Sequence, residues 1–71
     1  MFSMSLSIRN QIAGTVTDVA TGGAMGSVKV SVEGGELTAA ITKDAVEALG
    51  LASGTSVVAL IKSTEISLAA A

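Results

Sequence analysis

The chain contains no cysteine and no histidine, and Phe2 is its single aromatic residue. Disulfides, metal sites built from imidazole or thiolate ligands, and Cys- or His-based catalysis are therefore excluded. A domain of 71 residues buries only about 60% of the surface that its unfolded chain exposes, and so small a domain usually needs a further source of stability. Because 49% of the residues are hydrophobic and 14% are charged, we expect that source to be self-association.

Basic residues are also few, and they are scattered along the chain at Arg9, Lys29, Lys43 and Lys62, which leaves a net charge of −2. Nucleic-acid binding depends on many contacts from Lys and Arg to phosphates, and single-strand binding adds stacking aromatics. The sequence offers neither, so no nucleic-acid partner is expected. Any anion site in this chain must be small and local rather than a broad positive surface.

Long apolar runs are missing as well. The longest, at residues 57–61, is far shorter than the roughly 20 residues that a membrane-spanning helix requires. The first seven residues lack the basic region and continuous apolar core of a signal peptide. We therefore expect a single domain over residues 1–71, a cytoplasmic location and no membrane partner.

Alternating apolar and polar residues predict β-strands over most of the chain. The alternation is clearest at Val28, Val30 and Val32, and Gly34-Gly35 directly after it predicts a tight hairpin to the next strand. A glycine-rich flexible loop is predicted before this strand. The remaining predicted segments are a first strand beginning near Leu6 or Ile8, the loop at 21–26, a strand carrying Leu37, Ala39 and Ile41, and two last strands at 56–62 and 65–70.

One helix is predicted, from Thr42 as N-cap to Gly50 as the residue that ends it. Asp44 falls in its first turn, and Ala45, Val46 and Leu49 share one face. The strand at 56–62 is apolar on both faces, which predicts burial on both sides, against the domain interior and against another subunit. An all-β fold follows: a five-stranded OB-like Greek-key barrel with one short helix covering an end.

Two segments combine a cation with hydroxyl or amide groups: Ser7-Ile8-Arg9-Asn10-Gln11 and Ile61-Lys62-Ser63-Thr64. Such donor-rich groups suit a tetrahedral oxyanion. The residues alone leave alternatives open. They favour a surface ion pair of Arg9 with Asp18 or Glu65, and they suit Lys62 equally to a buried salt bridge and to an anion site. The six carboxylates are predicted at turns, on the helix surface and at strand ends, so no enzyme is expected.

Three motifs together resemble the molbindins, which are small Mop-type molybdate- and tungstate-binding proteins. They are S-x-R-N-Q at 7–11, I-T-x-D-A-V-x-x-L-G-L at 41–51 and A-x-I-K-S-T-x-I at 59–66. This family is related to the anion-binding domains of molybdate-responsive regulators and molybdate transporter ATPases. The resemblance spans essentially the whole chain, with the motifs in the family's order and spacing.

The resemblance implies a homohexamer, a trimer of dimers, that binds molybdate or tungstate at subunit interfaces by hydrogen bonds. It implies a role in molybdenum storage and homeostasis, without a cofactor or direct coordination of the metal by side chains. The first implied site consists of Ser7, Arg9, Asn10, Thr42, Lys62 and Ser63. The second, near the three-fold axis, is expected at Gly23, Ala24, Gly26, Ser27 and Lys29, although the glycines by themselves indicate only a mobile turn.

Two rival interpretations belong to other classes. The segment at 41–51 also resembles the short helix of AbrB-type swapped-hairpin transcription factors, which carry a Pro ahead of that helix and a basic face. This chain has no Pro and is acidic, which counts against DNA binding. A purely structural ring-forming protein would self-associate without responding to an anion.

Overall fold

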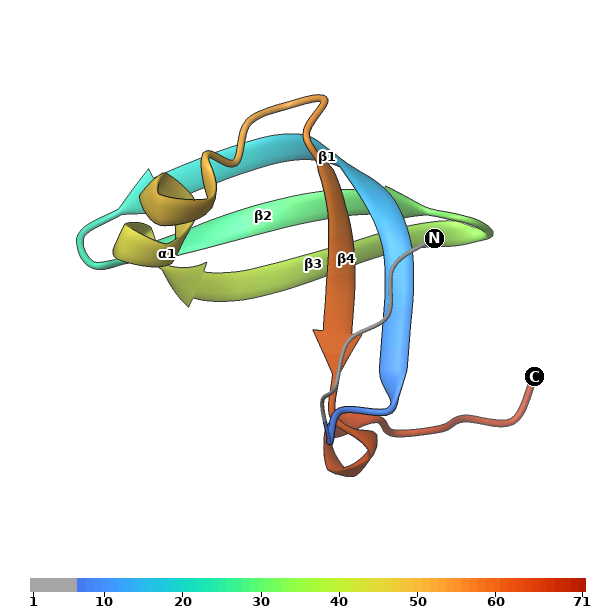
Figure 1. Cartoon of the computed structure of the whole chain (residues 1–71). Coiled ribbons are helices and arrows are strands. Elements are labelled where there is room, and N and C mark those ends of the chain that lie inside the picture. The colour runs from blue at the N-terminus through green and yellow to red at the C-terminus, as the bar shows by residue number, and fades with distance from the viewer. Residues whose placement is uncertain (1–6) are drawn as a thin grey trace.

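The structure is a computed structural model that describes residues 7–71. Four antiparallel strands form one sheet in the order β3-β2-β1-β4, and Figure 1 shows the helix beside one end of it. The alternation predicted for β2 is confirmed, because its valines lie on the buried face and the polar residues between them are exposed. The elements are β1 (Asn10–Gly22), β2 (Met25–Val32), β3 (Gly35–Thr42), α1 (Lys43–Leu49), β4 (Ser56–Ile61) and a 3₁₀ turn, η1 (Ser63–Glu65).

Strand β1 is the longest element, with 13 residues, and it joins the two halves of the fold. Its first part pairs with β4 and its later part pairs with β2, with an irregularity in register between Val16 and Asp18. A bulge of this kind bends a strand and increases its twist. As a result, the start of β1 and the whole of β4 cross over one face of β2 and β3 (Figure 1).

Gly14 lies where β1 pairs with β2 and β4 at the same time. A Cβ atom at this position would stand 2.6 Å from the Ser31 carbonyl oxygen and 2.6 Å from Cγ1 of Val30. Neither neighbour moves easily, because one is backbone and the other belongs to a buried side chain. The crossing therefore requires a residue without a side chain.

We expect Gly14→Ala to lower the free energy of unfolding by about 1–3 kcal/mol, the usual cost of overpacking. Urea denaturation measures this effect. Gly22→Ala is the matched control, because it lies in the same strand and a Cβ there meets nothing within 4 Å. Equal stability losses in the two variants would contradict the crowding argument.

Both hairpins of β2 are tight. A turn at Gly23–Ala24 joins Gly22 to Met25, so the flexible loop expected at 21–26 is wrong. Gly23 has φ 60, and a glycine with positive φ at the first central position lets a two-residue turn match the twist of its strands. The hairpin expected at Gly34-Gly35 is confirmed, with Gly34 in the turn and Gly35 already paired with Val32.

The helix is confirmed with its predicted caps. The Thr42 hydroxyl accepts a hydrogen bond from the backbone N–H of Ala45 at 3.1 Å, and Gly50 ends the helix at φ 63. The predicted apolar face is only partly correct, because Val46 is buried whereas Leu49 is 67% exposed. The helix has seven residues, and it packs chiefly against β2 and β3.

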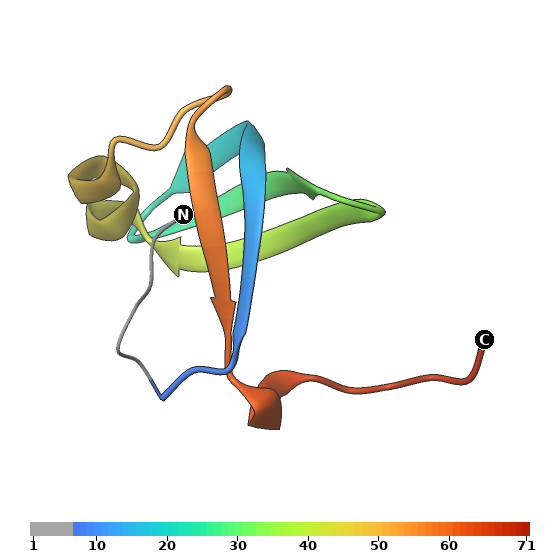
Figure 2. The same ribbon diagram turned by 45° about the vertical axis from the view of Figure 1, so that its right-hand side comes forward.

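The fifth strand, expected at 65–70, is wrong for the single chain. After β4 the chain turns at Lys62, where the backbone N–H of Glu65 donates to the Lys62 carbonyl at 2.9 Å. The residues beyond this turn run away from the sheet (Figure 2) and form no strand. Within residues 7–71, β3 and β4 are therefore the two edges of an open sheet and not neighbours in a closed barrel.

The core is small. In the described part of the chain, the buried hydrophobic side chains are Val16, Val28, Val30 and Val46. An apolar groove of about 460 Å³ lies between the β2–β3 face and β4. Strand β4 is half-buried rather than covered on both sides, since Leu60 remains 42% exposed. Among residues 7–71 no helix combines the length and the apolarity needed to cross a membrane.

Candidate functional site

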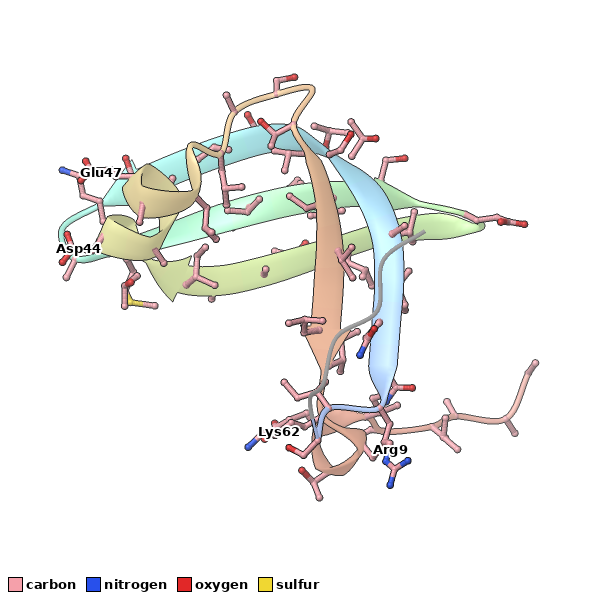
Figure 3. The ribbon with its side chains drawn as sticks, viewed as in Figure 1. Arg9, Asp44, Glu47 and Lys62 are labelled. Carbon is pink, nitrogen blue, oxygen red and sulfur yellow. The ribbon has the colours of Figure 1, made fainter. Side chains whose placement is uncertain are left out.

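Arg9 and Lys62 lie at the same end of the molecule, where β1 begins and β4 ends (Figure 3). Asn10 pairs with Ile61 in the antiparallel register, and continuing that register by one residue places Arg9 opposite Lys62. Both side chains are exposed, and their charged groups point outward in different directions. Two cations at one end of the molecule create a local positive field there, so this end favours an anion.

Hydroxyl groups lie beside these cations. Ser63 is the first residue of η1 and directly follows Lys62, while Ser7 precedes Arg9 by two residues. Both are exposed. Among the side-chain hydrogen bonds formed within residues 7–71, none uses Ser7, Arg9, Lys62 or Ser63. Within the described part of the chain, these donors are therefore available to an anion.

Asn10 makes a contact that the sequence does not reveal. Its side-chain amide donates a hydrogen bond to the Ile61 carbonyl oxygen at 3.1 Å, across 51 positions of the sequence. The acceptor is a backbone group, so no residue type marks it in the sequence. The amide of the neighbouring Gln11 bonds only locally, to the Ile8 carbonyl at 3.4 Å.

Thr42 does not join this group within one chain. It pairs with Met25 at the helix end of the sheet, whereas Asn10 and Ile61 lie at the far end of the β1–β4 pair (Figures 1 and 3). Its hydroxyl oxygen caps the helix. Thr42 and the Arg9–Lys62 pair therefore meet at one anion only if different copies of the chain supply them.

The residues expected at the second site lie in or next to the first hairpin. Gly26, Ser27 and Lys29 belong to β2, which pairs on both sides, so their main-chain N–H groups serve the sheet. The Ala24 carbonyl accepts from the Lys43 N–H at 2.8 Å. Gly26 also has a packing role, because a Cβ there would lie 2.8 Å from Cγ2 of Val46. Lys29 is exposed and pairs across the ladder with Asp18.

Carboxylates do not gather into a metal site. Asp44 and Glu47 lie on the helix, at the opposite end from Arg9 and Lys62 (Figure 3). No group of three or more His, Cys, Asp or Glu residues suited to a metal ion occurs in the described range. The chemistry available at the Arg9–Lys62 end is hydrogen-bond donation from two cations and two hydroxyls.

Comparison with known proteins decides the family. The TOBE domain model matches residues 6–68. Molybdenum-pterin-binding protein 3 of Clostridium pasteurianum is 40% identical over 94% of this chain and 100% of its own length. The chain belongs to the molbindin family of TOBE domains. The resemblance drawn from the three motifs is thus confirmed.

Solved molbindin structures share the fold. The molybdate-binding protein from Sporomusa ovata has a TM-score of 0.89 and 39% identity, covering 94% of this chain and 100% of that protein. ModG, described as a cytoplasmic molybdate-binding protein, has a TM-score of 0.83 and 41% identity, covering 87% of this chain and 45% of its own. These matches favour the molbindin interpretation over the AbrB-type alternative, which rests on the helix segment alone.

Proposed function

We propose that this molbindin binds molybdate, and also tungstate, at a site built around Arg9 and Lys62. The observation that carries the proposal is the Asn10–Ile61 pair, which brings the adjacent Arg9 and Lys62 to one end of the molecule, near Ser7 and Ser63 in the sequence. Molybdate is a dianion with four oxygens, and it needs donors from several directions. Hydrogen bonds from charged donors contribute roughly 1.5–3 kcal/mol each, so two cations with hydroxyls suffice for reversible capture.

One copy supplies only part of this site. Its cations stand on an open surface, where water screens their charge and weakens the attraction. A second copy that brings its Thr42 to this end excludes water from the site and adds a further donor. We therefore place the oxyanion at a subunit interface, with Ser7, Arg9, Lys62 and Ser63 from one copy and Thr42 from another.

Self-association is supported by apolar surface that one chain leaves uncovered. The groove along β4 is lined by aliphatic side chains including Leu37, Leu51 and Leu60. Ile66 is 44% exposed and Leu68 is 93% exposed. We propose that a second copy of the chain covers this apolar surface, because a small core and a high hydrophobic content favour self-association. The proposed assembly is the homohexamer that the family resemblance implies.

The biological role proposed is storage and homeostasis of molybdenum in the cytoplasm, without enzymatic activity and without nucleic-acid or membrane partners. The donor set described above binds an oxyanion but offers no group to transfer protons or electrons to it. A second oxyanion position near Gly23, Ala24 and Gly26 with Ser27 and Lys29 stays a prediction. It depends on the exposed Lys29 and Ser27 side chains, since the β2 backbone donors serve the sheet.

We expect isothermal titration calorimetry to show saturable binding of molybdate and tungstate, with sulfate at equal concentration giving little heat. Sulfate is smaller, so donors spaced for the longer metal–oxygen bonds reach it poorly. At one hundred times the dissociation constant, a ligand that binds only the folded state stabilises it by about 2.7 kcal/mol, which differential scanning calorimetry detects independently. Absence of heat and of stabilisation with both metal oxyanions would remove the proposed function.

A further inference from the structure

Asn10 occupies the last paired position between β1 and β4. It is half-buried, and its side-chain amide bonds to the carbonyl oxygen of its own register partner, Ile61, at 3.1 Å. Beyond this pair the two strands stop, because β1 begins at Asn10 and β4 ends at Ile61. The amide therefore adds a side-chain link between the two strands at the place where the ladder ends.

The residues just beyond this link tend to separate. Arg9 and Lys62 come directly after this last pair, outside the ladder, and like charges on neighbouring chain segments repel. Strand ends also open most readily, because few contacts hold them. The Asn10 hydrogen bond opposes both tendencies at the nearest possible point.

We propose that Asn10 is a positioning residue for the anion site, which acts by holding Arg9 and Lys62 at a fixed separation rather than by contacting the anion. This inference rests on the proposed function, since it concerns the same two cations. A site held at the right spacing before binding loses less free energy in ordering its donors. Asn10 therefore raises affinity through the other two side chains.

The alternative is that Asn10 donates to the oxyanion directly, as a member of the ligand set. The two roles differ in whether the effect of removing Asn10 depends on the presence of Arg9. Removing a direct ligand still weakens binding when Arg9 is absent, whereas removing a residue that acts through the Arg9–Lys62 spacing has no further effect once Arg9 is gone. A double-mutant cycle separates these cases.

The experiment measures molybdate affinity by calorimetry for the wild type, Asn10→Ala, Arg9→Ala and the double variant, at a temperature where circular dichroism shows all four folded. We expect Asn10→Ala to weaken binding about threefold to tenfold, the fold-change of one neutral hydrogen bond. In the Arg9→Ala background the same substitution should change affinity less than twofold. Gln11→Ala is the matched control, because this adjacent amide bonds only to the Ile8 carbonyl, and it should leave affinity unchanged.

Equal fold-losses from Asn10→Ala in both backgrounds would overturn the positioning role and leave the proposed function intact. No loss in the wild-type background would overturn it as well. A wild-type chain that fails to bind molybdate would overturn both. Should Asn10→Ala unfold at the assay temperature, Asn10→Ser keeps a hydroxyl but is too short to retain the same bond, and the cycle with Arg9 is run with that variant under the same criteria.

Discussion

Replacing Arg9 and Lys62 together by alanine is expected to abolish measurable molybdate binding. Each cation is proposed to donate charge-assisted hydrogen bonds worth roughly 1.5–3 kcal/mol. Each single variant should therefore weaken binding about tenfold to a hundredfold, since every 1.4 kcal/mol corresponds to a factor of ten. Calorimetric titration gives the affinity, and the melting temperature should no longer rise with molybdate.

The control for this prediction is Glu36→Gln, which changes one charge at an exposed position near the start of β3. Glu36 belongs to neither proposed oxyanion site. The affinity of this variant for molybdate should stay within about twofold of the wild type, because it loses no proposed donor and exposed charges are screened by salt. A double variant of Arg9 and Lys62 that binds as the wild type does would refute the site.

Leu68→Asp is expected to dissociate the assembly into smaller species. Leu68 is 93% exposed in the single chain, so its replacement removes no contact that folds one copy. If a neighbouring copy buries it, the lost burial alone costs about 1.5–3 kcal/mol per copy, and a buried, unpaired carboxylate adds further cost. A symmetric ring repeats the penalty at every interface.

Size-exclusion chromatography with light scattering measures this outcome, beside circular dichroism to show that the chain stays folded. Ser67→Asp introduces the same charge at the neighbouring exposed residue and should leave the mass unchanged. If Leu68→Asp keeps the wild-type mass, the C-terminal residues lie outside the interface. A monomeric wild-type chain would refute self-association itself.

Local patterns predicted those parts of the fold that local interactions determine. Val28 and Val30 alternate with polar residues because one face of β2 is buried, and Thr42 and Gly50 mark the ends of the helix because capping satisfies orphan backbone groups there. The two-residue turn at Gly23–Ala24 was mistaken for a loop. Several glycines suggest flexibility, whereas the register with β1 fixes the turn.

The fifth strand was predicted at 65–70, where Ile66 and Leu68 alternate with polar residues as is typical of a strand. A strand also needs an edge to pair with, and in a single chain the turn after Lys62 directs these residues away from both edges. Sequence alternation indicates which side of a strand is apolar, but it does not identify the neighbour. The prediction of a strand at 65–70 was therefore wrong, because the sequence does not show which strand these residues would pair with.

The site was predicted chiefly from the family motifs. Their residue types indicate donors for an oxyanion, and the observed register brings Arg9 and Lys62 to one end of the molecule. The same motifs grouped Thr42 with them, although it lies at the other end of the sheet. The bond from Asn10 to Ile61 was not predicted, because its acceptor is a carbonyl group that every residue carries.

The pairing of residue 10 with residue 61 has a consequence for synthesis in the cell. Contacts between distant parts of a chain form late in folding, since a long loop must close first, and translation proceeds at about 5–20 residues per second. The guanidinium of Arg9 therefore leaves the ribosome several seconds before the ammonium of Lys62. Oxyanion binding must wait until both have emerged, so incomplete translation products should not retain the ligand.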